Sequence, residues 1–146
     1  MSFKLMYHEI IEQFQKAEKR ADKIEVLRKH TDDNFLSFLK MAFDPRIVFD
    51  VEIPVYKPSI LPAGMNDLYL HSEVQRLYRF IKNHPRRPEG LTPQKQKSLL
   101  IALLEALHKD EAELLIRCMN KDLKVPFLTP KLLTDAFPGL EIGISS

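Results

Sequence analysis

Two segments of this chain combine basic side chains with a Thr-Pro pair that opens a helix. They are residues 86–95, with the pair at Thr92, and residues 121–131, with the pair at Thr129. The first backbone amides of a helix have no partner within the helix, and together with Lys and Arg they suit phosphate oxygens. The chemistry that these segments favour is therefore the binding of a phosphate group rather than a reaction.

Side chains that could catalyse a reaction or hold a metal are sparse. The chain has no Gly-x-x-x-x-Gly-Lys phosphate loop, and its five histidines lack the His-x-x-x-His spacing of a metal-binding helix. His8, Glu9 and Glu12 lie within one turn, which is typical of a solvated helix face. Cys118 lies on an apolar stripe, which indicates a core residue rather than a nucleophile. We therefore predict no catalytic residue, no metal site and no cofactor.

Length and composition are those of one compact domain. With 146 residues, 45% of them hydrophobic and 29% charged, the chain is long enough for a substantial core, and we predict a single domain over residues 1–146. A single cysteine excludes an internal disulfide and indicates a reducing compartment. No apolar run approaches the ~20 residues that span a membrane, and no signal-peptide core follows Met1. We expect a soluble, cytoplasmic protein that does not bind membranes.

Basic residues are concentrated in one part of the chain. Residues 1–78 hold 11 Lys and Arg against 12 Asp and Glu, a net charge of −1, whereas residues 79–131 hold 11 against 6, a net charge of +5. The remaining residues contribute −2. A local excess of this kind is expected of a surface that contacts nucleic acid, and also occurs on solvated helices that favour Lys and Arg.

Hydrophobic periodicity predicts an all-α fold of about seven helices. Apolar residues recur every three or four positions, and Asp32 or Asp33, Thr92 and Thr129 are suited to cap helix N-termini. Asp110 with Glu113 resembles a capping box for another helix. The expected helices run from Phe3 to Ala17, Lys23 to His30, Asp33 to Pro45, Leu68 to Ile81, Pro93 to Leu107, Asp110 to Met119 and Lys131 to Phe137.

Residues 44–66 do not fit a helical pattern. Apolar residues alternate from Ile47 to Val55, but Pro54, Pro58 and Pro62 prevent a regular ladder of strand hydrogen bonds. A flexible tether would not carry so many apolar side chains, so we predict an ordered connection that packs on the helices. The expected anchors are Ile47, Val48, Phe49, Val55, Tyr56, Ile60 and Leu61.

The end of the chain resembles a known family. Lys121-Asp122-Leu123 is followed by a short Pro-containing turn and a helical run that stops at Phe137-Pro138-Gly139-Leu140. This resembles the close of the N-terminal DNA-binding domain of ATP-dependent DNA ligases of the T-even bacteriophage type, where an Arg-Asp-Leu turn precedes a helix ending in aromatic-Pro-Gly-Leu. A Lys/Asp/Asn turn at 29–34, a Tyr-Lys-Pro crossing at 56–58 and an Arg-rich loop at 86–92 occur in a similar order, so the resemblance spans about residues 29–140.

The resemblance implies an all-helical domain that lies against the minor groove of duplex DNA near a nick and holds it mostly by phosphate contacts. Lys121 stands where the family has Arg, and Asp122 is expected to tether its loop, since a carboxylate beside phosphates would repel them. We expect the two basic loops to line up as one continuous positive strip. The expected DNA-binding residues are Arg86, Arg87, Gly90, Thr92, Lys95, Arg117, Lys121, Lys124, Thr129 and Lys131.

The sequence departs from the ligase pattern in two respects. Val125-Pro126-Phe127 replaces a glycine that lets the backbone approach DNA, so we expect this contact to be weakened, re-aimed or converted into a hydrophobic protein contact through Phe127. The Lys-x-Asp-Gly tetrad that ligases need for adenylation is absent, and the chain stops at Ser146 without room for the catalytic domains of a ligase. Both features favour a module that is not an enzyme.

Three functions follow from these expectations. The first is non-catalytic, sequence-independent binding of duplex DNA, at nicks or ends, in replication or repair, within the host cytoplasm if the protein is viral. The second is an adaptor or inhibitor that keeps the helical fold and binds a replication, repair or host protein. The third is one part of a split ligase whose catalytic part is a separate chain.

Overall fold

The computed structural model describes residues 5–62 and 65–140, and over these residues the predicted all-α class is confirmed. The described chain folds as one compact domain of seven α-helices and one 3₁₀ helix, and its extended pairing is limited to an isolated antiparallel bridge between Phe49 and Ile81. In chain order the helices are α1 (Tyr7–Lys16), α2 (Arg20–His30), α3 (Asp33–Phe43), α4 (Leu70–Glu73), the 3₁₀ helix η1 (Val74–Phe80), α5 (Pro93–Ala106), α6 (Lys109–Met119) and α7 (Pro130–Ala136).

Three helices start where the sequence predicts a capping side chain. The Asp32 carboxylate accepts a hydrogen bond from the Phe35 amide (2.9 Å) at the start of α3. The Thr92 and Thr129 hydroxyls accept from the amides three residues later, each at 3.2 Å, at the starts of α5 and α7. A proline follows each threonine at the first helical position, where its missing N–H costs nothing.

Two local predictions are wrong. The capping box at Asp110 and Glu113 does not form, because the N-cap of α6 lies two residues earlier, at His108, whose Nδ1 accepts from the Asp110 amide at 3.1 Å. The helix predicted from Leu68 to Ile81 is shorter and changes to 3₁₀ geometry after Glu73. The tighter turn still buries Val74, Leu77 and Phe80, which therefore anchor this segment on the core.

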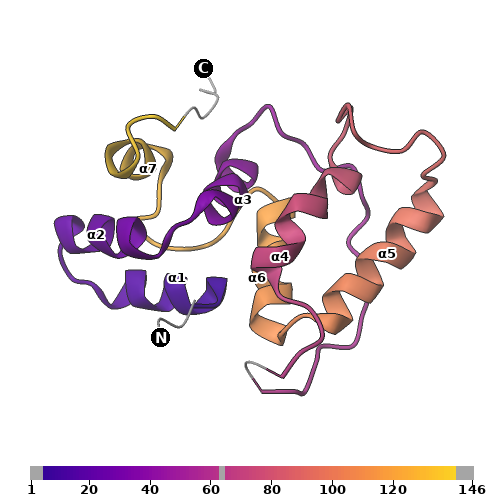
Figure 1. Cartoon of the computed structure of the whole chain (residues 1–146), viewed down its shortest axis with the longest axis horizontal. Helices are drawn as coiled ribbons and strands as arrows, with labels where there is room; N and C mark the ends of the chain where they lie inside the picture. The colour runs from indigo at the N-terminus through magenta and orange to yellow at the C-terminus, as the bar shows by residue number, and fades with distance from the viewer. Residues whose placement is uncertain (1–4, 63–64, 141–146) are drawn as a thin grey trace.

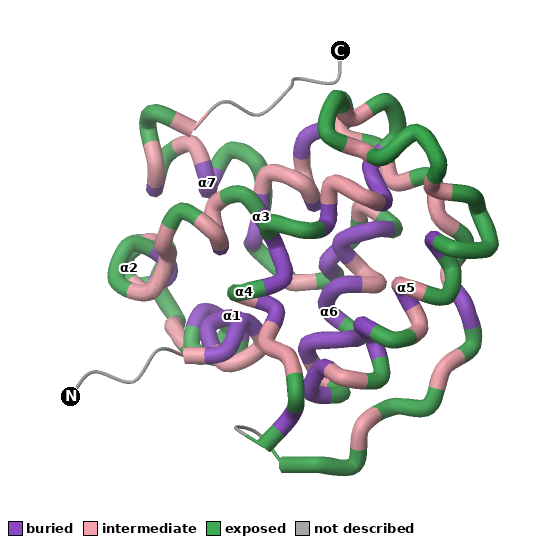
Figure 2. Tube along the Cα trace, turned by 45° about the vertical axis from the view of Figure 1, so that its right-hand side comes forward, coloured by how far each residue is buried: buried purple, intermediate pink, exposed green. Residues whose placement is uncertain are grey.

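The core lies between α1, α3, η1, α5 and α6. Figure 1 shows α4 and α6 in the middle of the molecule, α1, α2 and α7 toward one end of the longest axis, and α5 toward the other. Buried residues gather along α1 and α6 in Figure 2. Tyr7, Phe35 and Phe38 pack there with ring centroids 4.5 to 6.2 Å apart, and all three are buried. These ring contacts hold α1 against α3.

The connection from residue 44 to residue 66 packs on the helices only in part. Phe49 and Tyr56 pack against the core as predicted, and the main chain is fixed by the Asp50 amide, which donates to the Phe80 carbonyl (3.0 Å). Four predicted anchors are instead exposed: Val55 at 96%, Ile60 at 97%, Val48 at 47% and Leu61 at 44%. The apolar alternation that predicted burial of Val55 fails because Pro54 and Pro58, on either side of it, interrupt a strand ladder.

Candidate functional site

The loop between η1 and α5 holds Arg86 in an exposed, oriented position. The loop turns through the Arg87 amide, which donates to the His84 carbonyl (3.1 Å), and the Leu91 amide, which donates to the Pro88 carbonyl (3.2 Å). The Arg86 guanidinium lies 5.0 Å from the centroid of the Tyr78 ring. Such cation–π contact orients the guanidinium without using its N–H donors, which stay available for a phosphate.

Arg87 points into the protein and is not available as predicted. Its Nη1 donates to both carboxylate oxygens of Asp50 (2.6 and 2.7 Å) and to the Ile81 carbonyl (3.3 Å). Asp50 lies in the connection, so this ion pair ties the loop to a segment 37 residues earlier. Because a carboxylate already compensates its charge, Arg87 is a structural tether in this structure rather than a phosphate ligand.

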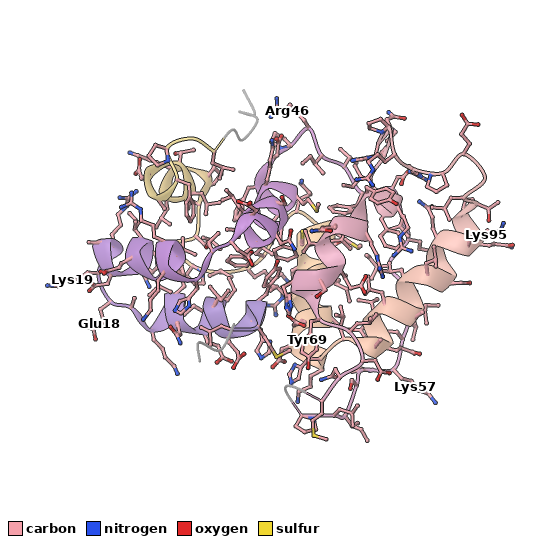
Figure 3. All side chains as sticks on the ribbon, viewed as in Figure 1. Glu18, Lys19, Arg46, Lys57, Tyr69 and Lys95 are labelled. Atoms are coloured by element: carbon pink, nitrogen blue, oxygen red, sulfur yellow. The ribbon has the colours of Figure 1, made fainter. Side chains whose placement is uncertain are left out.

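At the start of α5, a phosphate would meet exposed side chains more than unpaired backbone amides. The Thr92 hydroxyl is used by the Lys95 amide, and Pro93 has no N–H, which leaves the amide of Gln94 free in the first turn. Gly90 is exposed, and a Cβ placed on it would meet nothing within 4 Å. Lys95 is exposed, and its side chain extends outward at the end of the molecule in Figure 3.

Two basic residues that we did not predict as contacts lie next to these. The Gln96 side-chain amide donates to the carbonyl of the half-buried Arg79 (3.0 Å), which places Arg79 beside the start of α5. Lys82 is exposed and follows η1 closely. The sequence signal was present, because both residues lie off the apolar stripe of their segment. We call the set Arg79, Lys82, Arg86 and Lys95 the η1–α5 surface; Glu89, in the same loop, is an exposed acidic neighbour.

Lys121, the first residue of the ligase-like motif, has an internal role. Its ammonium donates to the main-chain carbonyls of Met41, Asp44 (2.7 Å) and Ile47 (2.7 Å). All three ammonium protons therefore have acceptors at the end of α3 and the start of the connection. Burial lowers the pKa of Lys121, while the nearby carboxylate of Asp44 opposes that shift. The expectation that Lys121 contacts DNA is not supported by this geometry.

The other predicted residues of this region divide into engaged and exposed groups. Arg117 donates to Glu113 (2.6 Å), and it shares no helix face with Lys121, because α6 ends at Met119 and Lys121 has a positive φ of 61°. Asp122 is structural as predicted: its carboxylate accepts from the Lys124 amide at 3.0 Å. The Lys124 side chain is exposed.

The start of α7 carries the remaining predicted contacts, Thr129 and Lys131. Both are exposed, although the Thr129 hydroxyl is taken by its capping hydrogen bond. In Figure 1 α7 and α5 lie toward opposite ends of the longest axis. The prediction of one continuous positive strip is therefore wrong for the starts of these two helices. The exposed cations of the η1–α5 surface and Lys131 on α7 therefore belong to different ends of the molecule.

The histidines are less dispersed than the sequence suggests. His8 on α1 and His108 at the start of α6 stack with ring centroids 4.7 Å apart, and Asp110 lies beside both. Packing of α1 on α6 brings these residues together across about a hundred positions of sequence, which spacing rules for a single helix do not detect. Among the helices that the structure describes, none is sufficiently long and apolar to cross a bilayer.

Comparison with known proteins gives a fold and a family. No curated protein matches this chain. The solved structure named Pmar-Lig_PreS3 is similar with a TM-score of 0.69 and 23% sequence identity, over 96% of this chain and 32% of that one. This chain thus spans about a third of that structure's length, and at such identity the similarity shows the fold alone. A family model described as "Family of unknown function (DUF6433)" matches residues 10–125, and the chain belongs to that family.

Proposed function

We propose that this protein binds duplex DNA without catalysing a reaction on it, through phosphate contacts made by the η1–α5 surface. The observation that carries the proposal is a set of four basic residues in the segment from η1 to the first turn of α5, of which Lys82, Arg86 and Lys95 are exposed and Arg79 is half-buried beside α5. Contacts of this kind position a protein on the duplex without reading its sequence. The function therefore needs no base-reading helix.

Side chains carry most of the binding in this proposal. A helix N-terminus attracts phosphate through unpaired amides, but Thr92 and Pro93 leave few of them at α5. Arg86 is the strongest candidate, because the Tyr78 ring orients its guanidinium and a guanidinium can hold two oxygens of one phosphate. Lys95, in the first turn of α5, supplies a second exposed positive charge.

The solved structure Pmar-Lig_PreS3 supports the helical scaffold of the proposal, since its fold is similar over 96% of this chain. The motif residues themselves act differently from our expectation, because Lys121 holds α3 instead of facing outward. The proposal therefore rests on the cations of the η1–α5 surface and uses the similarity as support for the scaffold that presents them. We propose that this binding serves DNA replication or repair.

The experiment is a titration of the protein against intact, nicked and single-stranded oligonucleotides at several salt concentrations. Four phosphate contacts predict a slope of log affinity against log salt of about −3.6 on duplex DNA. The double change Arg86→Ala/Lys95→Ala should reduce the size of that slope by up to about 1.8. Its matched control is Lys16→Ala/Lys19→Ala, which removes the same charge; Lys19 and Lys95 lie at opposite ends in Figure 3.

Two results would contradict the proposal. One is no detectable duplex binding at low salt. The other is an equal loss in both double variants, which would show a response to net charge and not to the η1–α5 surface. A ratio of nicked to intact affinity well above one would assign the protein to nicks, and a ratio near one would assign it to duplex in general.

A second function is favoured by one specific observation. Val55, Ile60 and Met65 are 96%, 97% and 66% exposed, and Phe127 is 72% exposed on another loop. Large apolar side chains that stay in water are typical of surfaces that bind another protein. If DNA binding is absent, we propose an adaptor or inhibitor whose Val55→Ser/Ile60→Ser variant keeps its fold and loses its protein partner.

A further inference from the structure

A cluster of three metal-ligand side chains joins α1 to the start of α6. His8 Nε2 lies 4.0 Å from Asp110 Oδ2, and His108 Nδ1 lies 3.9 Å from the same oxygen. One ligand atom from each residue can be chosen so that all three lie within 4.8 Å of one another. Two imidazoles and a carboxylate are the donor set of Zn²⁺ sites that keep a water as fourth ligand.

His8 is a buried polar side chain that the protein itself does not satisfy. Its side chain is 13% exposed, and its Nδ1 is buried and has no hydrogen-bond partner in the described part of the chain. The distance of 4.0 Å from Nε2 to Asp110 is too long for a hydrogen bond. Nε2, which faces Asp110, is therefore the ring nitrogen available to an ion, whereas the unpartnered Nδ1 is a separate buried polar atom that the ion would not satisfy.

The two elements that carry the ligands are held in place by Glu111. Its fully buried carboxylate accepts from the Tyr7 amide (3.4 Å), one residue before His8, and from the Leu70 amide at the start of α4 (3.1 Å). Glu111 also follows Asp110 directly. The relative position of the His8 and Asp110 backbones is therefore fixed by packing and hydrogen bonds, as a built binding site requires.

An open cavity reaches two residues of the cluster, His8 and Asp110, and gives an ion and its water access to them. The cavity has a volume of about 150 Å³ and is also lined by Glu12 and Glu113, whereas His108 is not part of its lining. Its two further carboxylates favour a cation over an anion, although Glu113 is partly compensated by Arg117 (2.6 Å). His8 is suited to metal binding in its neutral form, and burial together with the neighbouring His108 lowers its pKa.

We propose that His8, His108 and Asp110 bind one Zn²⁺-class ion, which clamps α1 to the N-terminus of α6. Zn–N and Zn–O distances of about 2.0–2.1 Å put neighbouring ligands about 3.4 Å apart in a tetrahedral site. The present 3.9 and 4.0 Å to Asp110 Oδ2 must therefore shorten by about 0.6 Å, which a rotamer adjustment of the half-exposed Asp110 supplies. This inference is independent of DNA binding.

Binding also requires one imidazole to turn. The His8 and His108 rings are nearly parallel, with an angle of 8° between their planes, whereas each ligand nitrogen directs its lone pair within its own ring plane. The ring that turns is that of His108, since it lies just before α6 and gives up its hydrogen bond from the Asp110 amide together with its stacking on His8. The ion replaces that helix-capping contact.

The test is Zn²⁺ and Co²⁺ binding to the full-length, untagged protein after chelator treatment. We expect one ion per chain by isothermal titration, the visible absorption bands of tetrahedral Co²⁺, and a thermal midpoint that rises with free Zn²⁺. His8→Gln and Asp110→Asn should each weaken Zn²⁺ binding at least tenfold, by about 1.4 kcal/mol or more. His30→Gln, which changes a histidine on α2, should leave it unchanged.

Asp110→Asn is the variant least expected to misfold. The Asp110 side chain is half-exposed, and the helix-capping hydrogen bond at this position is made by the Asp110 backbone amide, which the substitution keeps. A metal-free thermal midpoint close to wild type would show that each variant is folded. The proposal is overturned if Zn²⁺ binds with the same affinity to wild type and to both ligand variants. It is also overturned if Co²⁺ gives no tetrahedral spectrum or if no saturable binding occurs.

Discussion

Lys121→Met separates a structural role of this lysine from a role in contacting DNA. The change removes three hydrogen bonds from an ammonium to carbonyls at the end of α3, but keeps an unbranched apolar stem. A hydrogen bond from a charged donor contributes about 1.5–3 kcal/mol, and water replaces part of this at a half-buried site. We therefore expect a loss of roughly 2–4 kcal/mol in the free energy of unfolding, or roughly 6–12 °C in thermal midpoint.

Lys124→Met is the matched control for this change. Both lysines have a positive φ, 61° at Lys121 and 57° at Lys124, so methionine carries the same backbone cost as lysine at either position. The Lys124 side chain is exposed, and its replacement should change the free energy of unfolding by less than about 0.5 kcal/mol. The difference between the two variants thus reports the hydrogen bonds of the Lys121 ammonium.

Urea unfolding followed by circular dichroism measures both variants, and DNA binding is measured at a temperature where both stay folded. We expect Lys121→Met to lose stability and to keep the salt dependence of DNA affinity. Our reasoning is refuted if Lys121→Met unfolds at the wild-type urea midpoint while its salt slope falls by about 0.9. That outcome would return Lys121 to the phosphate-binding role implied by the ligase resemblance.

Two further predictions concern Cys118 and Phe127. Burial raises the pKa of Cys118 to about 12. Near pH 8 the thiol should therefore react with a disulfide reagent at least about a thousandfold more slowly in the native protein than in the urea-unfolded protein. Equal rates in the two states would contradict the burial of Cys118. Phe127 has a φ of 69°, and its side chain is 72% exposed. The free energy of unfolding in urea should therefore be about 1 kcal/mol higher for Phe127→Gly than for Phe127→Ala. The reverse order would show that the backbone is not strained at this position.

Sequence reasoning predicted those parts of the fold that local rules determine. Apolar spacing located the helices, and Asp32, Thr92 and Thr129 cap the helices they were expected to cap. Each of these features involves residues a few positions apart, so their physical cause lies within a short window of sequence. The start of α6 was missed because His108 is an uncommon cap, and its Nδ1 takes the place of the expected aspartate.

The site was harder to predict, because the use of each cation depends on partners far away in sequence. Arg87 finds Asp50 at a separation of 37 residues, and Lys121 finds the Ile47 carbonyl at a separation of 74. Arg86 is next to Arg87 and yet stays exposed on the Tyr78 ring. A count of basic residues treats these side chains alike, whereas only the tertiary structure determines which charges are already compensated and which remain for a ligand.

The loop of residues 121–127, where the ligase resemblance would lead one to expect a glycine, shows how the fold constrains a backbone without one. The backbone still adopts left-handed conformations at Lys121, Lys124 and Phe127, although each is unfavourable for a residue with a side chain. The turn is closed by the Leu128 amide, which donates to the Val125 carbonyl at 3.2 Å, and Pro126 with a positive φ after it matches a type II turn. Since glycine would relieve this strain, the side chains present must offset it. Lys121 does so by holding α3, which leaves the exposed Lys124 and Phe127 as the groups in this loop that can meet a partner.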